Sequence, residues 1–80
     1  MDVTNYIREM MKTISKRELI KLLKDDQYKN WEKAFLYAYQ VKHIDQKDPN
    51  TNYMYMGYDN ESQVIFFKEQ LTRQYHNLSI

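Results

Sequence analysis

The chain has 80 residues, enough for one small domain, and its 12 basic and 11 acidic side chains leave a net charge of +1. This balance excludes a global field of either sign that would attract a polyanion or a polycation. The absence of cysteine excludes disulfides, thiol nucleophiles and cysteine-based metal sites, and the scarcity of glycine and proline disfavours phosphate-binding loops and many-turned β folds.

The first part of the chain carries two amphipathic helical patterns. Apolar residues recur at helical spacing from Val3 to Ile14, which predicts a helix over 3–13. Ser15 and Glu18 then form a capping box, in which each side chain bonds to the backbone N–H of the other residue. Leu19 and Leu23 give the following segment one apolar face, so we expect a second helix over 16–25.

A third helix is predicted over 31–44, with Asn30 as its cap. Trp31 and Phe35 are assigned to the core, and Ala34 and Ala38 are expected to allow a close approach by a neighbouring helix. Other apolar residues of this segment spread around the helix, and an almost all-round apolar helix is either central in a fold or covered by a partner.

The pattern changes after residue 44. Residues 45–60 begin with turn-forming side chains and continue into a tyrosine-rich stretch, which could be a short strand but would have no partner in a helical domain. We interpret it as an ordered loop. A stripe that starts at Val64 and Phe67 predicts a last helix over 61–77. The expected fold is therefore an all-α, compact four-helix domain that spans residues 1–80.

The aromatic content, 15% of the chain with eight tyrosines, indicates a surface that binds protein. One small core cannot hold all the apolar residues that lie off the helical stripes, so we expect an exposed patch on the third and fourth helices. The predicted partner-binding residues are Leu36, Tyr37, Tyr39, Ile65 and Phe66.

A basic stripe supports an alternative, a helix-turn-helix-like regulator that binds DNA. Residues 8–33 hold eight basic and five acidic side chains, and Arg17, Lys21 and Lys24 share one face of the second helix. Lys33, Tyr37 and Gln40 on the third helix would face phosphates and bases. The break between these helices lacks the glycine common in such turns and is acidic.

Sites with chemistry of their own have weaker support. The segment from Asp48 to Asp59 follows EF-hand ligand spacing, but it lacks the glycine and the bidentate glutamate that a calcium loop needs. Arg73 and His76 would share a helical face, and His43 lies far away in sequence, so none of these residues forms a recognisable catalytic set. We expect no enzymatic activity, no metal, no cofactor and no small-molecule substrate.

The favoured function is a small non-enzymatic interaction module that docks on a larger protein or on its own copy. Residues with A/T-rich codons, such as Lys, Asn, Ile and Tyr, are abundant, which favours an accessory or inhibitory factor of a phage, plasmid or other mobile element. No apolar run approaches the about 18 residues of a membrane span and no signal peptide is visible, so we expect a cytoplasmic location without membrane contact.

Overall fold

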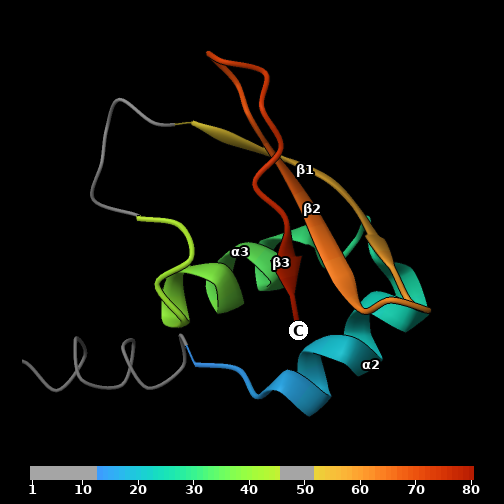
Figure 1. The fold of residues 1–80 in the computed structure, drawn as a ribbon. Coiled ribbons are helices and arrows are strands. Elements are labelled where there is room, and N and C mark those ends of the chain that lie inside the picture. Colours follow the sequence, from blue (N-terminus) through green and yellow to red (C-terminus); the bar gives the residue numbers. More distant parts are fainter. Residues whose placement is uncertain (1–12, 46–51) are drawn as a thin grey trace, which may run out of the picture.

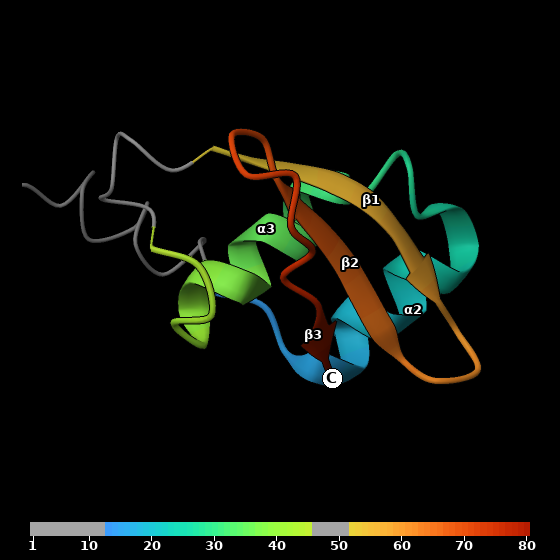
Figure 2. The same cartoon turned by 45° about the horizontal axis from the view of Figure 1, so that its top comes forward.

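The protein is described by a computed structural model over residues 13–45 and 52–80. Within these ranges two helices, α2 (Lys16–Asp26) and α3 (Trp31–Gln40), precede three strands, β1 (Tyr53–Asp59), β2 (Val64–Glu69) and β3 (Leu78–Ser79). The strands form one antiparallel sheet in the order β1-β2-β3, and both helices lie on the same side of it (Figures 1 and 2). The fold is therefore α+β, and the prediction of an all-α four-helix domain is wrong.

The two described helices begin where the sequence predicts. Ser15 Oγ accepts a hydrogen bond from the Glu18 N–H at 3.1 Å, which is the Ser15 half of the predicted capping box of α2. Helix α3 ends earlier than predicted because Lys42 has a left-handed φ of 60°. The N–H groups of Lys42 and His43 then bond to the carbonyls of Tyr39 and Ala38, which is a Schellman arrangement. The predicted helix over 3–13 lies outside the described residues.

Strands replace the predicted last helix over 61–77 and much of the predicted loop over 45–60. Val64 to Phe67 are β-branched or aromatic, a composition that favours a strand. Their apolar spacing also fits a helical stripe, which explains the wrong prediction. With β2 assigned as a helix, the alternating tyrosines at Tyr53 and Tyr55 had no strand to pair with. In the structure Tyr55 lies opposite Phe67, and Tyr53 opposite Glu69.

The core lies between the two helices and the inner face of the sheet. Phe67 is fully buried, and its ring centroid is 5.0 Å from that of Phe35 on α3. Ala34 and Ala38 are also fully buried, whereas Trp31, which we had assigned to the core, is 45% exposed. The buried apolar residues among those described are Ile14, Leu19, Leu23, Ala34, Ala38, Ile44, Tyr58, Ile65 and Phe67.

Two glutamine side chains join the elements by bonding to backbone as a peptide group would. Gln27, in the turn after α2, accepts from the Tyr58 N–H at 2.6 Å and from the Tyr55 hydroxyl at 3.1 Å, and donates to the Tyr58 carbonyl at 3.2 Å. Gln40, at the end of α3, accepts from the Ile14 N–H at 2.8 Å and donates to its carbonyl at 2.9 Å. The first amide ties the helices to β1, and the second ties α3 to the segment before α2.

Replacing Gln27 with alanine should lower the free energy of unfolding by about 2–3 kcal/mol, because two backbone groups and one hydroxyl lose their partner together. Urea unfolding followed by circular dichroism measures this loss. Gln74→Ala, at an exposed glutamine of the β2–β3 connection, is the matched control and should change stability by less than about 0.5 kcal/mol. Equal effects of the two changes would contradict the role of Gln27.

Burial, with smaller contributions from Tyr28 and Tyr58, raises the pKa of Tyr55 from 10.0 to about 12. A phenol with a raised pKa in the folded state stabilises the fold fully below its unfolded pKa, and that contribution is lost as the pH rises through about 12. The unfolding free energy of the protein should therefore fall between about pH 10 and about pH 12 more steeply than that of Tyr55→Phe. Parallel curves for the two proteins would refute the assignment to Tyr55.

Candidate binding site on the outer face of the sheet

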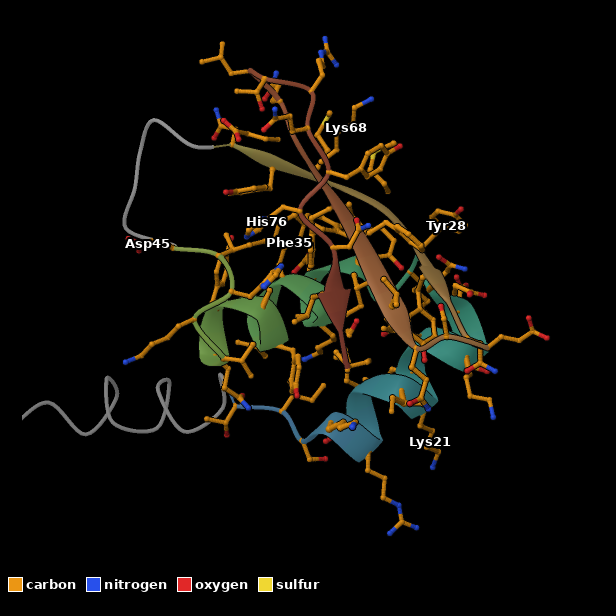
Figure 3. All side chains as sticks on the ribbon, viewed as in Figure 1. Lys21, Tyr28, Phe35, Asp45, Lys68 and His76 are labelled. Atoms are coloured by element: carbon orange, nitrogen blue, oxygen red, sulfur yellow. The ribbon has the colours of Figure 1, made fainter. Side chains whose placement is uncertain are left out.

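Strand β2 divides its side chains between two faces of the sheet. Ile65 and Phe67 are fully buried on the inner face, which the helices cover. Because side chains alternate along a strand, Val64, Phe66 and Lys68 point to the opposite face. Figure 3 shows Phe35 between α3 and the sheet and Lys68 on the other side of the sheet.

The strand pairing extends this second face to β1 and to the segment that ends in β3. Met54 and Tyr75 lie opposite Lys68, and Asp59 lies opposite Val64. The pairing of Ile65 with Leu78 places Asn77 beside Phe66. Residues opposite each other in antiparallel strands share a face. We call this the outer face, formed by Met54, Met56, Asp59, Val64, Phe66, Lys68, Tyr75, Asn77 and Ser79.

A β-bulge places Met56 on the outer face. The register of β1 shifts between Tyr55 and Gly57, so Met56 is an extra residue without a partner of its own on β2. Gly57 has a φ of 133°, which side-chain-bearing residues rarely adopt. The lone glycine of the chain therefore allows the bulge, and the bulge places Met56 on the same face as Phe66.

The centre of the outer face is an open hollow of about 330 Å³, lined by Met56, Phe66, Tyr75 and Asn77. Met56 is 41% exposed and Tyr75 is 55% exposed. The Lys68 ammonium lies 5.3 Å from the centroid of the Tyr75 ring, which is a cation–π contact at the edge of the hollow. A thioether and two aromatic rings around an open depression are suited to bind another apolar side chain.

The two charged side chains of the outer face lie at its opposite ends. Along β2, Lys68 is two residues after Phe66, and Asp59 is paired with Val64, two residues before Phe66. The hydroxyl and N–H of Ser62 bond to the Asp59 carboxylate at 2.6 and 3.3 Å and lower the pKa of Asp59. The face is thus apolar in the middle, with a cation at one end and an anion at the other.

The five predicted partner-binding residues do not form one surface. Leu36, Tyr37 and Tyr39 are half-buried on α3 and pack against the core. Ile65 is fully buried and is therefore part of the core, whereas Phe66 lines the hollow on the opposite face. Sequence reasoning missed Met56 and Tyr75 because the strands had been assigned as loop and helix.

The residues predicted to bind nucleic acid are only partly available. Arg17, Lys21 and Lys24 are exposed on α2, and Lys21 points away from the sheet (Figure 3). Lys33 is exposed on α3. The Gln40 amide, however, bonds to both backbone groups of Ile14, so it is not free to read bases in this structure.

His43 and His76, which are far apart in sequence, lie in contact. Their rings stack with centroids 4.2 Å apart, and each Nε2 donates to the backbone carbonyl of the other residue, at 3.1 and 2.9 Å. Arg73 is in the β2–β3 connection with a φ of 63°, so it does not share a helical face with His76. Because both Nε2 atoms are engaged as donors, this pair joins the chain after α3 to the segment before β3.

The described ranges give no support to a metal site. They contain no group of three or more His, Cys, Asp or Glu side chains that could hold a metal ion. Met54, Met56 and Asp59 of the EF-hand-like spacing belong to strand β1 rather than to a loop. Among the described residues, no helix has the length and apolar character required to cross a membrane.

Comparison with known proteins gives no relative from which a function could be transferred. No protein-family model matches the chain, and searches of curated proteins and of solved structures find no match.

Replacing His76 with alanine should loosen the segment before β3, because the hydrogen bond from its Nε2 to the His43 carbonyl and the stacked ring are lost together. We expect about 1–2 kcal/mol of destabilisation. Relative to the unsubstituted protein, amide exchange should accelerate more in residues 76–80 than in α2. Hydrogen exchange read by NMR measures both effects. Ser79→Ala, at an exposed position of β3, is the control, and unchanged exchange in His76→Ala would show that the histidine pair does not hold this segment.

Proposed function

We propose that the protein is a small non-enzymatic interaction module that binds protein through the outer face of its sheet. This proposal keeps the class of function expected from the sequence and moves the contact surface from the helices to the strands. The observation that carries it is the open hollow between Met56, Phe66 and Tyr75, on the face opposite to both described helices.

The free energy available at this face supports association. Met56 and Tyr75 are each about half exposed, although both belong to residue types that are enriched at protein interfaces. Burying a fully exposed apolar side chain contributes about 1.5–3 kcal/mol, so covering the exposed half of one such side chain contributes about 1 kcal/mol. The paired strands hold the backbone of this face, so little backbone freedom is lost when a partner binds.

Charge favours a protein over a nucleic acid at this face. Residues 52–80 carry two basic and three acidic side chains, and the outer face holds one cation and one anion. Binding of a phosphate backbone requires several cations on one surface. The exposed cations of α2 keep DNA binding as the alternative. The side-chain amide of Gln40 on α3, which that alternative requires to read bases, is already bonded to Ile14.

The biological setting that we propose is an accessory or inhibitory factor of a phage, plasmid or other mobile element. The A/T-rich codon usage implied by the composition supports this setting. A small protein of this kind would act by occupying a surface on its target rather than by chemistry of its own.

A photoreactive amino acid in place of Phe66 tests the proposed surface in the native host. With p-benzoylphenylalanine at position 66, irradiation should give a covalent adduct to a protein, and nuclease treatment should leave that adduct unchanged. The same substitution at Tyr28, which is 69% exposed in the turn between α2 and α3, should give at least about tenfold less adduct.

A second change in the same chain controls for chance proximity. Met56→Glu places a charge in the hollow and should abolish the adduct at position 66, whereas Leu71→Glu, at a residue 84% exposed outside the outer face, should not. The proposal fails if position 66 gives no adduct, gives only a nucleic-acid adduct, or gives an adduct that Met56→Glu leaves unchanged.

A further inference from the structure

We infer that the partner of the outer face is a second copy of this chain, bound face to face about a twofold axis that runs across the strands near Phe66. This inference rests on the proposed function, since it names the protein that covers the same surface. It follows from the way in which charge and apolar area are arranged around Phe66.

The charges of the outer face complement each other under one particular rotation. Lys68 and Asp59 lie at equal distances in register from Phe66, on opposite sides of it. A rotation of 180° about an axis across the strands reverses the strand direction and brings Lys68 of one copy over the end that holds Asp59 of the other. Symmetry repeats the same contact at the other end of the interface.

A twofold axis parallel to the strands gives the opposite result. It places Lys68 at the same level as its own symmetry mate, with no carboxylate of the outer face at that level. Like charges directly across an interface are costly. Charge therefore selects the axis that runs across the strands, and with it the antiparallel arrangement of the two sheets.

The apolar centre is consistent with the same axis. Phe66 and its neighbour Asn77 share the level of the axis, so each lies over its own symmetry mate and the two hollows face each other. Two sheets that pack face to face are about 10 Å apart, a gap that side chains from both copies fill. Met56 and Tyr75, about half exposed in one chain, would then be covered.

The reach of the side chains allows the ionic contact. Asp59 is on β1 and Lys68 is on β2, so after the rotation their backbone positions are about one strand spacing, roughly 4.8 Å, apart laterally. The Lys68 ammonium, which lies over the Tyr75 ring in the single chain, turns from the β3 side toward β1 to make this contact. A lysine side chain spans the remaining gap between the sheets together with a carboxylate. The Asp59 carboxylate is held toward its end of the face by its bonds to Ser62.

Sedimentation equilibrium of the purified full chain tests the inference. The protein should dimerise, and Lys68→Glu, which sets two acidic side chains against each other at both ends, should weaken the dimer by at least about tenfold. Asp59→Asn combined with Lys68→Glu should recover part of that loss, because asparagine can still accept the bonds from Ser62 and removes the repulsion. Lys21→Glu on α2 makes the same charge change away from the face and should leave the dimer intact.

Directed cross-linking tests the axis. The chain contains no cysteine, so Asn77→Cys introduces a single thiol, and a short bis-maleimide should join two copies through it. Lys21→Cys should give no covalent dimer under the same conditions. A dimer that resists Lys68→Glu and is not cross-linked through position 77 would overturn the inference.

The two proposals fail separately. If the purified chain stays monomeric while the photoprobe at position 66 joins it to a different protein, the outer face binds protein but not a second copy. If the chain is monomeric and the photoprobe yields no protein adduct, both proposals are wrong.

Discussion

The antiparallel register between β1 and β2 decides which side chains the helices cover and which face outward. With Tyr55 opposite Phe67 and Tyr58 opposite Ile65, one face of the hairpin carries the large residues that complete the core against α2 and α3. A shift of one residue would exchange the two faces and move Phe66 and Lys68 inward. The bulge at Met56 absorbs one residue of β1 and so keeps Tyr58 on the inner face beyond it.

Polar side chains fix the positions that apolar packing leaves open. The amides of Gln27 and Gln40 bond to backbone groups of Tyr58 and Ile14, which are distant from them in sequence. The stacked rings of His43 and His76 connect two further segments in the same way. Apolar contacts are nondirectional, whereas a two-point hydrogen bond permits one relative placement of the groups that it joins. In a chain with a small core, such contacts specify how helices and sheet meet.

In a sheet covered by helices on one face, the side chains of the other face are not needed to fill the core, so their types can be suited to binding. Here that face is apolar in the middle around Phe66 and oppositely charged at its ends, at Lys68 and Asp59. The hairpin therefore closes the core with alternate residues, and in the function that we propose it presents a contact surface with the others. Substitutions on the outer face should change association with little effect on the core, because the two sets of side chains point in opposite directions.

Local signals determined the two described helices. Short-range sequence patterns predict the cap at Ser15, and they also predict the burial of Leu19, Leu23, Ala34 and Ala38. The strands could not be assigned in the same way. The apolar run from Val64 to Phe67 fits both the spacing of a helix and that of a strand, and the choice depends on whether another strand pairs with it. Tyr53 to Asp59 supplies that strand only in three dimensions, and a pairing across a turn leaves no trace in either segment alone. The tertiary structure therefore decided the sheet, and with it the outer face and the contact between the two histidines.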